Sequence, residues 1–280
     1  MKYELIVFDL DGTLLDPAKT ITSRALKAIK SAFACGLKVT ISTGRTFPSA
    51  KPYVEALGIK GLVSFQNSAL MLSFDPLEVY RLVNFPRERL LEVLLTAKEL
   101  GLFPMLFTPS FTPPYIVMEK EFPSNSPFLF YFEKSLPNAF LVDNIIEALN
   151  WSLSFNEVVL VGKTEKVVEF VNTFQGRDVS LILNSKAGGE AFLEVYGPGC
   201  SKEISLRYFS EFYGVPLEKI VFVGDNLNDI DAIRCAGLGV AMDNAPEEVK
   251  READMIIPSN ASDGVACFLE DILDEESKVL

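Results

Sequence analysis

The sequence contains no histidine, and this absence removes several kinds of chemistry at once. A serine protease triad, a Cys–His pair, an HExxH zinc site and a histidine phosphatase all require an imidazole. Any proton transfer in this protein must therefore use carboxylate, lysine, tyrosine or cysteine side chains.

Cysteine and long apolar runs are also scarce. The four cysteines are widely spaced and form no CxxC motif, so we predict neither a zinc site nor a disulfide framework. The apolar run Leu5 to Phe8 ends at Asp9, and no uncharged stretch reaches the ~18 residues that a membrane span needs. We expect reduced thiols, no membrane partner and a cytoplasmic location.

Basic residues are outnumbered by acidic ones. Lys+Arg is 26 and Asp+Glu is 38, which gives a formal net charge of −12. A protein of this sign repels phosphate backbones and anionic membranes, so nucleic acid is not an expected partner. The 280 residues are 49% hydrophobic, which predicts a soluble globular protein, most simply of two units. The oligomeric state is left open by these data.

Alternating strands and helices at both ends of the chain predict an α/β core. YELIVF (Tyr3–Phe8) and LKVTIS (Leu37–Ser42) have the pattern of buried strands on either side of a helix, which makes a right-handed β-α-β unit. The alternation returns with the strand AFLEV, followed by IVFVG (Ile220–Gly224). We predict a doubly wound, parallel, Rossmann-like sheet.

The middle of the chain breaks this alternation. From residue 84 to 188 strands and helices are harder to follow, and aromatic residues are dense between Phe103 and Phe132. We expect a smaller α+β second domain inserted at 84–188, within a core formed by 1–83 and 189–280. The aromatic residues are interpreted as the core of the insertion, with an aromatic substrate pocket as the alternative.

Carboxylates follow two of the predicted core strands. Asp9 and Asp11 come directly after the first strand, and Asp225 and Asp229 come after the strand IVFVG. Strand ends of a parallel sheet meet at one edge, so we expect the four acids to converge. Neighbouring carboxylates raise each other's pKa unless a cation lies between them. A hard cation such as Mg²⁺ is the natural ligand of such a site.

Groups that could bind phosphate are expected at the same edge of the sheet as the carboxylates. Thr43 and Gly44 end the second strand and offer a hydroxyl and an amide to a phosphate oxygen. Lys202 begins a predicted helix, where a cation opposes the helix dipole, and we interpret it as a charge clamp. The combination favours phosphoryl transfer, with a carboxylate as nucleophile.

These motifs together resemble a known family. DLDGTLLD, STGR, the lone Lys202 and GDNLND resemble the four motifs of the haloacid dehalogenase superfamily of phosphatases, and GVAMDNAPEEVKREADMIIPSNASDGVA resembles its Cof-type sugar-phosphatase branch. In that branch a large α/β cap is inserted after the second motif, which coincides with residues 84–188. The resemblance implies a Mg²⁺-dependent phosphatase that hydrolyses a small phosphometabolite, such as a sugar phosphate, through an aspartyl-phosphate intermediate.

The resemblance also implies roles for the acidic residues. Asp9 would be the nucleophile and a metal ligand, and Asp11 would act first as an acid and then as a base, with its backbone carbonyl on Mg²⁺. Asp225 would be the second carboxylate ligand. Asp229 would support the metal's waters.

The phosphate would be held by Thr43, Gly44, Lys202 and Asn228 in the same comparison. Arg45 is either a further phosphate contact or part of a structural ion pair. Two positions depart from the branch: Asn67 lies in the sequence QNSA where Asn-Gly-Ala is usual, and Lys202 is followed by glutamate in place of glycine.

Other readings of the same residues stay open. A phosphomutase or phosphotransferase would use the same chemistry and return the phosphoryl group to a sugar. A phospho-aspartate switch or a phosphate-binding protein would not hydrolyse substrate. Asp11 argues against the switch, because an acid/base carboxylate two residues from the nucleophile favours rapid hydrolysis.

Overall fold

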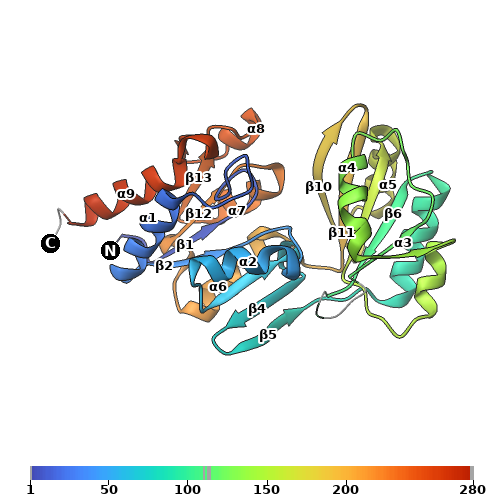
Figure 1. Ribbon diagram of the computed structural model, residues 1–280, viewed down its shortest axis with the longest axis horizontal. Coiled ribbons are helices and arrows are strands. Elements are labelled where there is room, and N and C mark those ends of the chain that lie inside the picture. Colours follow the sequence, from blue (N-terminus) through green and yellow to red (C-terminus); the bar gives the residue numbers. More distant parts are fainter. Residues whose placement is uncertain (1, 110, 112–114, 278–280) are drawn as a thin grey trace. The chain divides into compact units, whose positions relative to one another are not determined.

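A computed structural model of the chain describes residues 2–109, 111 and 115–277. The chain divides into two compact units (Figure 1). Unit 1 consists of the residues up to Arg45, of Ser49–Arg81 and of the residues from Ser201 onward. Unit 2 consists of Thr46–Pro48 and Leu82–Cys200.

Unit 1 is built on a five-stranded sheet whose paired strands are all parallel. Two of its inner strands, β1 (Leu5–Phe8) and β12 (Ile220–Gly224), are buried along their whole length, because helices cover both faces of such a sheet. In sheet order the strands are β14 (Met255–Ile257), β13 (Leu238–Met242), β12 (Ile220–Gly224), β1 (Leu5–Phe8) and β2 (Lys38–Ile41).

The sheet of unit 1 is wound in both directions from its centre. The chain passes from β1 to β2 on one side and from β12 through β13 to β14 on the other. Right-handed crossovers therefore place the connecting helices on opposite faces. The predicted doubly wound core is confirmed. Its helices are α1 (Ser23–Ala34), α2 (Phe47–Leu57), α6 (Lys202–Tyr213), α7 (Ile230–Cys235), α8 (Glu247–Lys250) and α9 (Gly264–Ser277).

A small antiparallel sheet extends the edge of the core beyond β2. It contains β3 (Leu62–Phe65), β4 (Leu70–Phe74) and β5 (Leu77–Leu82). A bridge between Ser42 and Ser64 joins it to the end of β2.

Unit 2 has a six-stranded sheet with one parallel pair, β7 with β8, and otherwise antiparallel pairing. Helices α3 and α5 pack on one face and α4 packs on the other, which is the expected α+β arrangement. In sheet order the strands are β10 (Ser180–Ala187), β11 (Glu190–Tyr196), β9 (Glu157–Lys163), β6 (Phe103–Phe107), β7 (Ile116–Glu119) and β8 (Ala139–Val142), and the helices are α3 (Arg87–Glu99), α4 (Leu129–Ser135) and α5 (Thr164–Phe174).

The strand AFLEV corrects one expectation. The sequence assigned it to the core sheet, but β11 pairs with β9 and β10 in the sheet of unit 2. A buried strand shows its apolar pattern without showing its partner, which explains the error. Unit 2 therefore continues to Cys200 and does not end at 188.

The aromatic residues of unit 2 form a packed core. Phe103, Phe107, Phe132 and Phe192 are at most 8% exposed and belong to one cluster. Edge-to-face contacts such as Phe103–Phe132, with ring centroids 5.2 Å apart, are typical of a protein interior. Seven of the nine aromatic residues between Phe103 and Phe132 belong to this core or pack against it, whereas Phe111 and Phe130 are exposed.

Candidate active site

The predicted catalytic aspartates lie where the strand order of the core reverses. Asp9 directly follows β1 and Asp225 directly follows β12, and these two strands are parallel neighbours. The Asp9 amide continues the ladder by donating to the Val223 carbonyl, with N and O 3.0 Å apart. Ligands of open α/β sheets bind at this kind of reversal point, outside the carboxyl ends of the strands.

Three carboxylates meet at this point. Asp9, Asp225 and Asp229 each offer an oxygen, and these oxygens lie within 4.8 Å of one another. Asp9 is 4% exposed and Asp229 is fully buried. A buried group of hard oxygen donors fits a divalent cation such as Mg²⁺.

The electrostatics of the group also fit a cation. Burial, and then the neighbouring Asp229 carboxylate, raises the pKa of Asp225 to about 7. Burial likewise raises the pKa of Asp9 well above its usual value, although Lys202 opposes the shift. Both carboxylates therefore carry a cost of ionisation that a bound cation would relieve.

Lys202 supplies the positive charge inside the cluster. Its Nζ lies 3.0 Å from Asp9 Oδ1 and 2.6 Å from Asp229 Oδ1, and the side chain is 1% exposed. Burial alone would lower the pKa of Lys202, but Asp229 and Asp9 outweigh it and raise the pKa above its usual value. Ser201 caps α6, because its side chain accepts from the Ile204 amide, and so fixes where Lys202 begins the helix.

Asp229 serves several partners at once. Its Oδ1 accepts from Lys202, and its Oδ2 accepts from the amides of Asp225 and Asn226 at 2.9 Å each. These contacts hold the loop after β12 against Lys202. The predicted support of metal-bound water stays a prediction.

Asp225 is positioned by close backbone packing. Gly12 has φ +80°, and a Cβ on it would lie 2.1 Å from Asp225 Oδ2, so only glycine fits there. Thr13 Oγ1 donates to Asp225 Oδ1 at 2.8 Å. Asn244, which the sequence analysis did not single out, donates to the Gly12 carbonyl at 2.9 Å. Its place directly after the β13 region, at the same sheet edge, is the signal that could have found it.

The carboxylate of Asp11 has different neighbours. It accepts two hydrogen bonds from Arg45 and one from Lys19, and it is not a member of the three-carboxylate group. Of the two roles expected for Arg45, a phosphate contact or a structural ion pair, the structure therefore shows the ion pair.

The groups expected to hold phosphate lie around Lys202 and at the end of β2. The Asn228 amide oxygen is 3.4 Å from Lys202 Nζ. Thr43 is buried after β2, where its Oγ1 accepts from the Arg45 amide at 3.1 Å, and Gly44 follows it. These contacts place Asn228 at the ammonium group and Thr43 beside Arg45.

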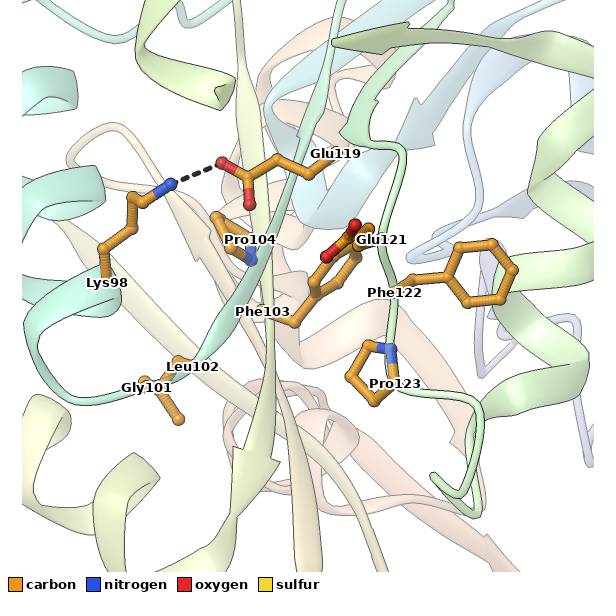
Figure 2. Close-up of a pocket in the computed structure, with 9 residues that line it drawn as sticks. All are labelled: Lys98, Gly101, Leu102, Phe103, Pro104, Glu119, Glu121, Phe122 and Pro123. Atoms are coloured by element: carbon orange, nitrogen blue, oxygen red, sulfur yellow. Dashed lines mark hydrogen bonds and ion pairs between the residues drawn. The ribbon is translucent and has the colours of Figure 1, made fainter. Parts of the chain in front are cut away.

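A hollow on unit 2 is a separate feature (Figure 2). Its volume is about 400 Å³, and Lys98 spans part of it to pair with Glu119 at 2.5 Å. Glu119 also accepts a hydrogen bond from the Ile145 amide, which connects the ion pair to the segment after β8. The lining residues include no predicted site residue; they are Lys98, Gly101, Leu102, Phe103, Pro104, Glu119, Glu121, Phe122 and Pro123.

The chain belongs to the haloacid dehalogenase-like hydrolases, a family that it matches over residues 6–269. The membership expected from its motifs is confirmed, and with it the assignment to an enzyme, a hydrolase of the phosphatase type. No helix in the described part of the chain is long and apolar enough to cross a membrane.

Curated relatives cover nearly the whole chain. A 5-amino-6-(5-phospho-D-ribitylamino)uracil phosphatase of Bacillus subtilis is 27% identical, over 95% of this chain and 96% of its own length. A chloroplastic endoribonuclease, YBEY, of Arabidopsis thaliana is 29% identical over 95% of this chain. The chain spans only 46% of that protein.

A solved structure shows the same fold. The haloacid dehalogenase-like hydrolase of Bacteroides thetaiotaomicron has a TM-score of 0.77 and 27% identity. The likeness covers 97% of this chain and all of that one.

Proposed function

We propose that the protein is a Mg²⁺-dependent phosphatase that hydrolyses a small phosphorylated metabolite through an aspartyl-phosphate intermediate. The placement of Asp9 carries the proposal. Its carboxylate is buried at the end of β1, 3.0 Å from the ammonium of Lys202, and grouped with Asp225 and Asp229. A nucleophilic carboxylate needs this combination of a fixed position and nearby positive charge.

The carboxylates of Asp9 and Asp225 would hold Mg²⁺, together with the backbone carbonyl of Asp11. Asp229 would contribute indirectly, by accepting hydrogen bonds from Lys202 and from the backbone amides of the loop after β12. When bound, the cation neutralises carboxylate and phosphate charge, which lets an acidic site accept a dianion.

The chain's own residues supply the remaining chemistry. An Asp9 oxygen attacks phosphorus as the bond to the leaving oxygen breaks, and Asp11 gives its proton to that oxygen. Asp11 then takes a proton from water, whose oxygen attacks phosphorus, breaks the bond to Asp9 and releases phosphate. Thr43, Gly44, Lys202 and Asn228 would hold the phosphoryl oxygens through both steps.

Protonation of the leaving oxygen by Asp11 requires the Asp11 side chain to change its partners. Its carboxylate is paired with Arg45 and Lys19, which favour the ionised form. Asp11 must leave these cations before it can carry a proton. Arg45, once released, would be available to the substrate phosphate, so the two roles expected for it are compatible.

The substrate class follows from the same chemistry and from the relatives. The named uracil-derivative phosphatase supports a small phosphomonoester as substrate, and the cytoplasmic location is part of the same proposal. We further propose that unit 2 confers specificity for the leaving group.

Phosphate release from a panel of phosphomonoesters, with and without Mg²⁺, tests the function. Sugar phosphates, nucleotides, phosphorylated ribityl compounds and 4-nitrophenyl phosphate would be compared for wild type, Asp9→Asn and Asp231→Asn. Asp231 is an exposed control, with its side chain 74% exposed. We expect Mg²⁺-dependent release that only Asp9→Asn abolishes. Normal release by Asp9→Asn would refute the nucleophile, and an isomerised sugar phosphate without free phosphate would indicate a mutase.

A further inference from the structure

The turn between β3 and β4 has an unusual backbone. Gln66, Asn67 and Ser68 have φ angles of 48°, 49° and 73°, in the left-handed region that residues other than glycine rarely adopt. All three residues are 0% exposed. Such a backbone persists only where surrounding contacts fix it, and it concentrates at functional sites.

The backbone of this turn is tied to the loop after β2. The Asn67 amide donates to the Thr43 carbonyl, and the Gln66 amide donates to the Arg45 carbonyl, both with N and O 3.0 Å apart. The turn therefore has a fixed position relative to the loop that carries Thr43, Gly44 and Arg45.

The side chains of the turn reach two further segments. Ser68 Oγ accepts from the amide of Ser201, the N-cap of α6, at 3.3 Å. Asn67 Oδ1 accepts from Asn228 Nδ2 at 3.3 Å. One turn thus touches the three stretches of chain that carry the phosphate-holding groups.

The contact between Asn67 and Asn228 decides how the Asn228 amide is oriented. Because its nitrogen donates to Asn67, its oxygen faces the Lys202 ammonium at 3.4 Å. Without the acceptor on Asn67 the amide could turn over and place its NH₂ group against the ammonium, where two donors would oppose each other. Asn67 thus favours one of the two orientations.

We propose that Asn67 and Ser68 are positioning residues for phosphoryl transfer. The left-handed turn fixes the Asn228 amide and the first residue of α6, so that Asn228 and Lys202 meet the phosphoryl group in one geometry. Neither Asn67 nor Ser68 needs to touch the substrate. This inference rests on the proposed phosphatase function and deepens it.

Asn67→Gly tests the proposal with little added strain, because glycine adopts positive φ freely. We expect roughly tenfold lower kcat/KM with 4-nitrophenyl phosphate, because misplaced groups slow an otherwise intact reaction. Orthovanadate, which resembles the transferring phosphoryl group, should bind more weakly by a similar factor. The melting temperature should stay close to that of wild type.

Asp263→Gly is the matched control. Asp263 also has positive φ, at 55°, and its side chain also accepts a hydrogen bond, from Thr22 Oγ1 at 2.5 Å. We expect wild-type kcat/KM and orthovanadate affinity for this variant. If Asn67→Gly does not fold, Asn67→Ser replaces it, since serine already occupies the next left-handed position and is too short to reach Asn228.

A double-mutant cycle with Asn228→Ala separates positioning from general stability. If Asn67 acts through Asn228, its substitution should have little further effect on kcat/KM once the Asn228 amide is gone. Full additivity would overturn the proposal, as would wild-type orthovanadate affinity in Asn67→Gly. A wild-type protein that neither binds orthovanadate nor releases phosphate would overturn the phosphatase function as well. Orthovanadate binding that Asn67→Gly leaves unchanged would overturn only the positioning role.

Discussion

Arg45 contacts both carboxylate oxygens of Asp11, with Nε 2.5 Å from Oδ2 and Nη2 2.7 Å from Oδ1. Lys19 also contacts this carboxylate, with its Nζ 2.7 Å from Asp11 Oδ1. Burial alone would raise the pKa of Asp11, but the hydrogen bonds from Arg45 and Lys19 lower it to about 2. The carboxylate is therefore ionised in this arrangement, which suits a base.

Arg45→Gln is expected to raise the pKa of Asp11 toward or above its usual 3.8. A carboxyl whose pKa is lowered by folding stabilises the protein above the unfolded-state pKa, and this stability is lost as pH falls through the folded-state pKa. The variant should therefore be less stable than wild type at pH 7. The difference should shrink as the pH falls from 4 toward 2, which urea unfolding at several pH values would measure.

The control for this prediction is Arg24→Gln. Arg24 forms a similar two-bond pair with Glu270, but on the surface, where ion pairs contribute little. We expect a small effect on stability. If both variants lost the same stability at every pH, the coupling of Arg45 to Asp11 would be wrong.

Lys202→Met should be much more damaging to stability. The substitution keeps most of the side-chain volume but leaves the carboxylates of Asp9 and Asp229 buried beside each other without their cation. Removing one partner of a buried ion pair costs about 3–5 kcal/mol. We expect a loss of that order in the free energy of unfolding of metal-free protein at pH 7, followed by circular dichroism in denaturant.

The loss should be smaller at pH 5, because burial raises the pKa of Asp9 and this carboxylate can then take up a proton. Lys219→Met is the matched control, since Lys219 pairs with Glu4 at 2.5 Å on the half-exposed surface. It should cost little. An equal cost for the two lysines would show that Lys202 does not neutralise a buried acidic cluster.

The parts of the site that the sequence predicts best are those that the sheet topology brings together. Asp9 and Asp225 each follow a parallel strand, so their convergence follows from the fold. For Arg45 a structural ion pair with no named partner was one of two options. Its partner Asp11 lies 34 residues away, and that spacing does not show which way a long side chain turns. Asn244 donates to the Gly12 carbonyl at 2.9 Å and to Asp225 Oδ2 at 3.4 Å. It was missed because the segment GVAMDNAPEEV does not by itself show that this side chain reaches the loop after β1.

The fold shows the same division. The parallel core was predictable from its short apolar strands and the helices between them. The partner of β11 was not, because its alternation of apolar residues fits either sheet, and the pairing with β9 and β10 depends on long-range packing. The left-handed turn at Asn67 was equally hidden, since its sequence contains no glycine.

Mg²⁺ should stabilise the protein more strongly as pH rises. Burial and Asp229 raise the pKa of Asp225 to about 7, and Asp9 is shifted in the same direction. A group whose pKa is raised by folding contributes stability that is present below the unfolded-state pKa and lost as pH rises through the folded-state pKa. Metal-free protein should therefore lose stability between about pH 4 and pH 7, the range set by the usual pKa of 3.8 and the raised one.

Bound Mg²⁺ favours the ionised carboxylates and should offset that loss. Melting temperatures with Mg²⁺ and with EDTA, measured from pH 5 to pH 8, would show a difference that grows with pH. Asp225→Asn should remove most of the difference, whereas Asp231→Asn should keep it. A Mg²⁺ effect that is constant across this range would refute the assignment of these carboxylates to the metal.

Gly12→Ala and Gly36→Ala separate backbone strain from displacement of the metal site. Both glycines have positive φ, +80° and +85°, so both alanines should cost about 1–3 kcal/mol of stability. A Cβ at residue 36 meets no atom within 4 Å, whereas one at residue 12 would lie 2.1 Å from Asp225 Oδ2. We therefore expect Gly36→Ala to keep its affinity for Mg²⁺ in calorimetric titration and its phosphate release. Gly12→Ala should lose both, because its Cβ must push the Asp225 carboxylate out of place, and retained Mg²⁺ affinity would mean that Asp225 is not a metal ligand.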